Sequence, residues 1–92
     1  MKQDSAEALA LNILGWLVGD DDLLPTFLGS TGMDGAELRA RAGEAEVLAA
    51  VLDFLMMNDE WVNRWADETQ GDPMGVMRAR QALPGGEQVN WT

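Results

Sequence analysis

The sequence has 92 residues with a formal net charge of −10, and 47% of its residues are hydrophobic. This length predicts a single domain over residues 1–92, and the apolar fraction is ordinary for a chain that folds around a core. Cysteine and histidine are both absent, which excludes disulfides, thiol or histidine catalysis and the usual zinc and haem sites. We therefore expect a protein that is not an enzyme and holds no cofactor or metal.

Helix start and stop signals divide the chain into six segments. Asp4 and Glu7 have the spacing of a capping box before the first apolar run, and Gly19 follows that run. An aspartate followed by Pro73 is a strong start signal for the last helix. From capping residue to terminating residue, the predicted helical segments are 4–19, 20–32, 34–43, 44–57, 58–71 and 72–84.

The chain resembles itself when it is shifted by 38 residues. Residues 10–34 then align without a gap on residues 48–72, and the capping and large apolar positions coincide. No segment alternates with the period of a strand. We predict an all-α, compact bundle of about six short helices, built as two three-helix repeats over residues 6–43 and 44–83.

The first helix of each repeat is apolar around most of its circumference, so both should lie at the shared core. The other four helices should cover this central pair. Val18 lies beside the main apolar face of the first helix, and Asp53 falls on the narrow strip that faces solvent in its counterpart. We expect the folded core to span residues 5–84, with mobile tails at 1–4 and 87–92.

Four short motifs of apolar and capping residues carry a family resemblance. They are LGWLVGD at 14–20, FL before TG at 27–32, VLDFL at 51–55 and ALPGG at 82–86. Residues 5–86 resemble a family of small acidic alphaproteobacterial proteins defined only as a domain of unknown function. The resemblance implies a compact helical fold and transfers no catalytic residue. The family tends to have a leucine-type position before the last helix, where this chain has Gln70-Gly71-Asp72.

Two stretches have the pattern of a helix-turn-helix, with a glycine between apolar flanks. The candidate recognition helices carry arginine pairs, Arg39 with Arg41 and Arg78 with Arg80. These four residues define an alternative hypothesis, a nucleic-acid binder. The acidity of both halves of the chain disfavours it, because such proteins need a basic surface. An acidic mimic of DNA is a further alternative.

Acidic clusters at residues 20–22 and 58–60 raise the question of a cation site. Calcium loops place their oxygen ligands at alternating positions with a central glycine, which consecutive aspartates do not reproduce. Helix capping explains both clusters better. Sixteen acidic residues also make some carboxylate pair inevitable, so such a pair is weak support for an enzyme.

Methionine and tryptophan supply the main functional hypothesis. Met57 and Trp61 fall at positions that we expect to be partly exposed, and both residue types are enriched at protein interfaces. We predict a non-enzymatic helical protein-protein interaction module, whose partner is another protein or a second copy of the chain. Met57 and Trp61 are the candidate partner surface.

The apolar run at residues 8–18 does not indicate a targeting or membrane segment. Acidic Asp4 and Glu7 replace the basic leader of a signal peptide. The run is also shorter than the roughly 20 residues that span a bilayer. We expect a cytoplasmic protein with no membrane partner.

Overall fold

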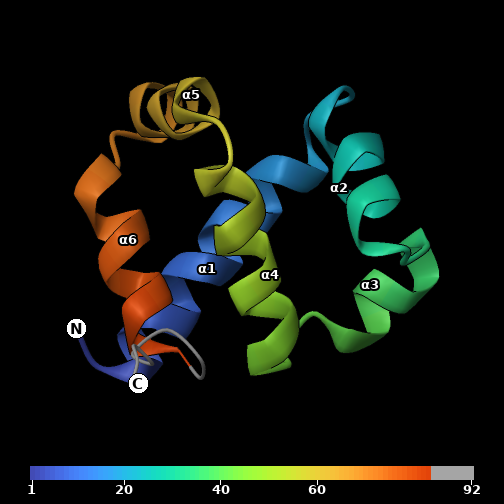
Figure 1. Ribbon diagram of the computed structural model, residues 1–92, viewed down its shortest axis with the longest axis horizontal. Helices are drawn as coiled ribbons and strands as arrows, with labels where there is room; N and C mark the ends of the chain where they lie inside the picture. The colour runs from blue at the N-terminus through green and yellow to red at the C-terminus, as the bar shows by residue number, and fades with distance from the viewer. Residues whose placement is uncertain (84–92) are drawn as a thin grey trace, which may run out of the picture.

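The computed structural model describes residues 1–83, and every regular element in that range is an α-helix (Figure 1). The all-α fold class and the six helices predicted from the sequence are confirmed. The radius of gyration is 12.6 Å, close to the roughly 12 Å expected of a packed domain of this length. The helices are α1 (Gln3–Val18), α2 (Leu23–Thr31), α3 (Gly35–Arg41), α4 (Ala45–Met56), α5 (Asp59–Thr69) and α6 (Pro73–Ala82).

Side-chain caps fix the start of three helices where the sequence placed them. The carboxylates of Asp34 and Asp72 and the amide oxygen of Asn58 each accept a hydrogen bond from a backbone N–H in the first turn that follows. These bonds satisfy donors that have no partner inside the helix. The predicted boundaries of α3, α5 and α6 follow directly from these caps.

The predicted start of α1 is wrong. The helix begins at Gln3, inside the predicted tail of residues 1–4, and Asp4 lies in its first turn rather than at its cap. Glu7 accepts a hydrogen bond from the side chain of Gln3 at 3.0 Å, so no capping box forms. The other predicted tail, residues 87–92, lies outside the described residues.

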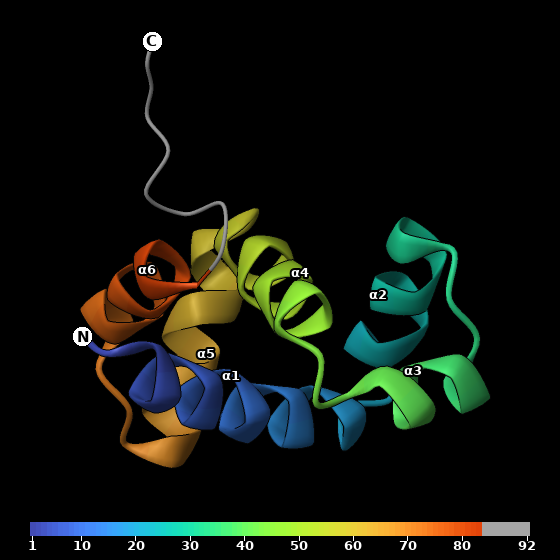
Figure 2. The same ribbon diagram turned by 90° about the horizontal axis from the view of Figure 1, so that it is seen from below.

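The two apolar helices α1 and α4 lie at the centre of the molecule, as predicted. They cross one another, and α6 packs against both (Figures 1 and 2). Phe27 of α2 meets Phe54 of α4 edge to face, with 5.2 Å between ring centroids. The largest fully buried side chains are Trp65, Phe27, Ile13, Leu17, Leu48, Leu52, Leu55, Leu83, Val51 and Val76.

The expectation that all four outer helices cover the central pair needs correction for α3. This helix lies at the periphery beside α2 (Figure 2), and Leu38 is its one buried residue. No helix within residues 1–83 is long and apolar enough to cross a membrane.

Local geometry in the two halves corresponds at the predicted offset of 38 residues. Gly32 and Gln70 both adopt the left-handed conformation after a helix, with φ of 77° and 60°. Thr31 donates its hydroxyl to the carbonyl of Phe27, and Thr69 donates likewise to Trp65. The outer helices pack differently in the two halves, and a duplication stays a prediction.

Candidate functional site: a methionine-lined groove

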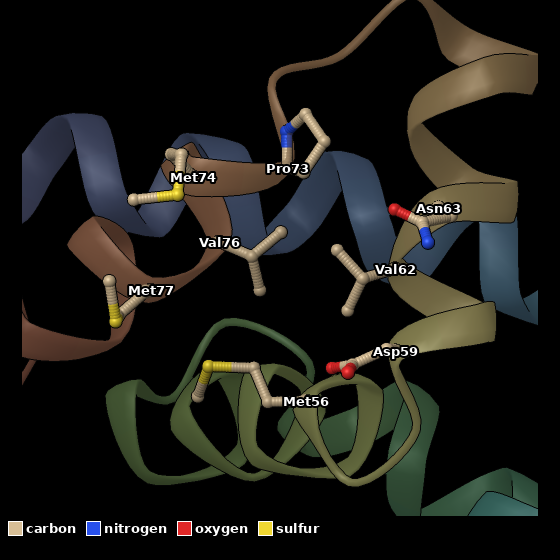
Figure 3. Close-up of a pocket in the computed structure, with 8 residues that line it drawn as sticks. All are labelled: Met56, Asp59, Val62, Asn63, Pro73, Met74, Val76 and Met77. Atoms are coloured by element: carbon tan, nitrogen blue, oxygen red, sulfur yellow. The ribbon is translucent and has the colours of Figure 1, made fainter.

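A groove lies where α4, α5 and α6 meet, and its volume is about 440 Å³. Met56 lines it from α4, while Met74 and Met77 line it from α6 (Figure 3). Val62 and Val76 are the buried apolar residues of its wall. The remaining lining residues are Asp59, Asn63 and Pro73.

The sequence of α6 explains why methionines are available here. Asp72 caps the helix and Pro73 occupies its first turn, which sets the rotation of the residues that follow. Val76 then faces the core, where it is almost fully buried. Met74 and Met77, three residues apart, share a helical face and stay accessible, with exposed fractions of 52% and 44%.

The groove is mostly apolar, and one carboxylate stands at its edge. Asp59 is the one charged residue among its lining side chains, and it stands at the start of α5, where a carboxylate suits the helix dipole. Methionine side chains are flexible and polarisable, so a surface made of them adapts to partners of different shape. This arrangement suits binding of an apolar side chain that has basic neighbours.

Met57 and Trp61, the residues predicted from the sequence, are accessible to different degrees. Met57 follows the end of α4 and has an exposed fraction of 72%. Trp61 is only partly exposed, because its ring stacks on Phe54 with 4.7 Å between centroids. Neither residue lines the groove. The structure therefore separates this predicted pair from the groove beside it.

Three of the four arginines of the nucleic-acid hypothesis bind carboxylates of the protein itself. Arg41 lies 3.0 Å from Glu37 and also pairs with a second glutamate. Arg80 forms an ion pair with Asp53 at 2.7 Å. The guanidinium of Arg78 lies 3.6 Å from the carboxylate of Asp72, the residue that caps α6.

Arg39 differs from these three arginines. Within residues 1–83 no carboxylate lies within ion-pair distance of Arg39. Arg41, in contrast, donates hydrogen bonds to the carboxylates of Glu44 and Glu37. These bonds raise the pKa of its guanidinium, so the Arg41 side chain stays charged.

A polar and aromatic cluster joins the end of α1 to α5. Arg64 donates a hydrogen bond to Asp20 and lies over the ring of Trp16, 5.5 Å from its centroid. Glu68 accepts a hydrogen bond from the indole N–H of Trp16 at 2.8 Å. The backbone N–H of Leu23, together with other donors and Arg64, lowers the pKa of Asp20. The cluster holds α5 against α1.

The acidic clusters act as helix caps, as predicted. Asp20 accepts hydrogen bonds from the backbone N–H groups of Asp22 and Leu23, both at 2.9 Å. Asn58 accepts one from Glu60 at 2.9 Å. In the part of the chain that the structure describes, no three acidic side chains are grouped as a metal site.

Comparison with known protein families identifies the family of the chain. Residues 3–86 match the family model described as "Protein of unknown function (DUF3572)". The chain belongs to this family. The resemblance seen in the sequence motifs is confirmed over nearly the whole chain, and the DUF3572 description assigns no activity to its members. Comparison with curated proteins and with solved structures found no match.

Sequence reasoning missed the groove of this DUF3572 protein, although part of the signal was present. Met74 and Met77 have helical i, i+3 spacing directly after a strong helix start. Met56 lies far from them in the chain, and only the packing of α6 on α4 brings it alongside. The groove is thus a property of tertiary structure, which a single helical pattern does not contain.

Proposed function

We propose that the protein is a cytoplasmic, non-enzymatic interaction module that binds a basic amphipathic helix of a partner protein in the methionine-lined groove. The observation that carries this proposal is the accessible cluster of Met56, Met74 and Met77 over buried Val62 and Val76. Apolar side chains of an incoming helix, spaced three or four residues apart, fit such a groove.

The charge of the chain supports a basic partner. The net charge is −10, and Asp59 is the charged residue of the groove's lining. Lysine or arginine beside the apolar anchors of a partner helix would be attracted to Asp59 and to the net negative charge of the chain, which would accelerate association.

Ion pairing within the protein supports a protein partner over nucleic acid. Arg41, Arg78 and Arg80 each contact a carboxylate of the chain, so their charge is already partly compensated. Phosphate binding needs uncompensated cations on one face. We assign neither a nucleic-acid-binding role nor a DNA-mimic role to the groove.

Methionine methyl NMR tests the proposed function directly. The probe is a synthetic helical peptide with leucine on one face and lysine on the other. The control is the same peptide with glutamate in place of lysine. We expect the lysine peptide to shift the methyl signals of Met56, Met74 and Met77, and the glutamate peptide to leave them in place. Unmoved groove methyls, or equal binding of both peptides, would contradict the proposal.

Two substitutions locate the binding surface. Met77→Glu places a charge in the groove and should weaken binding of the lysine peptide by about tenfold or more. Met57→Glu is the matched control, because Met57 is more exposed and does not line the groove. If Met57→Glu alone weakened binding, the surface would be the Met57 and Trp61 pair instead.

A further inference from the structure

Met74 and Met77 place two accessible thioether sulfurs in the methionine-lined groove (Figure 3). Both side chains are exposed. Met56, the third methionine of the groove, is partly buried and packs against the core. Since oxidation of a sulfur follows its accessibility, a dissolved oxidant reaches Met74 and Met77 before Met56.

Thioethers are the only sulfur groups of this chain. The sequence has six methionines and no cysteine, so no thiol of the protein reacts with peroxide first. A thioether carries no proton, and its reaction with peroxide needs neither a base nor a metal. Mild oxidation of this protein by peroxide therefore falls on its accessible methionines.

Apolar contact alone does not require methionine at both positions of α6. Leucine has a comparable helix propensity and a similar volume, so it would present much the same apolar face to a partner helix. Leucine lacks a sulfur whose polarity changes on oxidation. Met74 and Met77 lie about one helical turn apart, and both line the groove to which we assign the partner helix.

We propose that Met74 and Met77 are sites of reversible oxidation by hydrogen peroxide, and that their sulfoxides release the basic helix from the groove. This inference rests on the proposed function, because it assigns a regulation to the same groove. In each reaction the sulfur lone pair attacks one peroxide oxygen, so that an S–O bond forms and the O–O bond breaks. The thioether is oxidised to a sulfoxide, and the second oxygen leaves as water with both peroxide protons. Two thiols of a reductant reverse the reaction, giving a disulfide and water.

Each sulfoxide makes an apolar part of the groove polar. Its oxygen is a hydrogen-bond acceptor, and the leucine face of a bound helix would exclude water from it. The buried wall residues Val62 and Val76 offer no side-chain donor. Among the lining residues that the structure describes, Asn63 is the side chain with N–H donors, and the Asp59 carboxylate offers only acceptors. A desolvated acceptor short of donors disfavours the complex.

Exposure of Met74 and Met77 makes their oxidation compatible with the fold. In the protein without a partner, water hydrates both sulfoxide oxygens, and buried Val62 and Val76 keep the wall beneath them apolar. We therefore expect the protein oxidised at these two residues to unfold at nearly the same temperature as the unoxidised protein. The penalty of oxidation falls on the complex.

Peptide binding by the full chain before and after limited peroxide treatment tests this proposal. The probe is the leucine-lysine peptide, which contains no sulfur, and mass spectrometry of proteolytic fragments identifies the oxidised residues. Oxidation of Met74 and Met77 should raise the peptide dissociation constant about tenfold or more. Methionine sulfoxide reductases with a thiol should restore it. Undiminished binding after both residues are oxidised, or a loss that the reductases do not reverse, would overturn the proposal.

Leucine variants separate oxidation in the groove from oxidation elsewhere. In the double variant Met74→Leu with Met77→Leu, the dissociation constants before and after peroxide should agree, because neither position can be oxidised. Met57→Leu is the matched control, since it removes a more exposed methionine that does not line the groove. This control should lose the peptide after peroxide as the wild type does. Peroxide sensitivity that persists in the double variant, or disappears in Met57→Leu, would overturn the assignment to Met74 and Met77.

The order of the measurements separates this proposal from the proposed function. A protein that binds no leucine-lysine peptide before peroxide is added would contradict the proposed function, and the regulation with it. Binding that survives oxidation of both methionines would overturn the regulation alone. An oxidised protein with a much lower unfolding temperature would also overturn the regulation, because the peptide would then be lost through unfolding.

Discussion

Helices α3 and α6 occupy equivalent places in the two halves of the chain, yet α6 packs against both central helices whereas α3 contributes only Leu38 to the core. Asp34 and Asp72 lie 38 residues apart, their carboxylates cap the two helices, and each helix begins at the next residue. The inward positions differ in size and charge. In α6 they are Gly75, Val76 and Ala79, and the matching residues of α3 are Glu37, Leu38 and Arg41.

Small residues allow α6 to approach α1 closely. An added Cβ at Gly75 would stand 3.6 Å from the methyl group of Leu9, and Ala79 is fully buried. In α3 the matching positions hold the Glu37–Arg41 ion pair at 3.0 Å, which keeps its hydration only at the surface. Caps therefore set where both helices begin, and the inward side chains decide which one packs. The packing of α6 on α4 places Met74 and Met77 beside Met56 in the groove.

The largest expected effect comes from giving α6 the residue found in α3. Ala79→Arg would bury a charge at a position with no room, and we expect the free energy of unfolding to fall by about 3 kcal/mol or more. The reciprocal change, Arg41→Ala, should alter stability little, because the ion pairs that it removes lie at the surface. Urea unfolding followed by tryptophan fluorescence measures both. Equal effects of the two substitutions would remove the packing distinction between α6 and α3.

In the second half of the chain, the backbone of Gly71 lies very close to the ring of Trp65. An added Cβ at Gly71 would stand 2.4 Å from the indole of buried Trp65. We expect Gly71→Ala to cost about 1–3 kcal/mol. Gly29→Ala is the matched control, since an added Cβ there meets open space. Thermal unfolding should show a lower Tm for the first variant and an unchanged or higher Tm for the second.

The left-handed residues after α2 and α5 offer a reciprocal exchange. Gly32→Gln should destabilise the fold by about 1 kcal/mol, because a side chain disfavours positive φ. Gln70→Gly should stabilise it by about 0.5 kcal/mol, since glycine suits the φ of 60° at that position. Denaturant midpoints of the two variants should therefore move in opposite directions. Movement in the same direction would contradict the equivalence of the two turns.

Asp20 and Asn58 fill equivalent capping positions, but only Asp20 titrates. The backbone N–H of Leu23, together with other donors and Arg64, lowers the folded-state pKa of Asp20. The carboxylate therefore stabilises the fold above about pH 4, its unfolded-state range, and this contribution is lost as the pH falls through the folded-state pKa. Asp20→Asn should thus be less stable than the wild type near neutral pH, with the difference shrinking towards about pH 3. A difference independent of pH would contradict this assignment.

Most helix boundaries could be predicted from the sequence, whereas the exposure of individual side chains at the surface could not. The caps at Asp34, Asn58 and Asp72 are local signals, so helix starts followed from single residues. The start of α1 did not, because Lys2 occupies its cap position without a side-chain bond. Val18 was expected beside the core and is half exposed, since its cover depends on where α3 packs. That packing is set by contacts between residues distant in the chain.

The methionine-lined groove is assigned to a basic helix of a partner protein. Sedimentation velocity with a fluorescent lysine-leucine peptide tests this assignment most directly. The wild type and the Met57→Glu variant should carry the peptide, and the Met77→Glu variant should lose it. A peptide retained by the Met77→Glu variant, or lost from the Met57→Glu variant alone, would contradict the assignment of the groove.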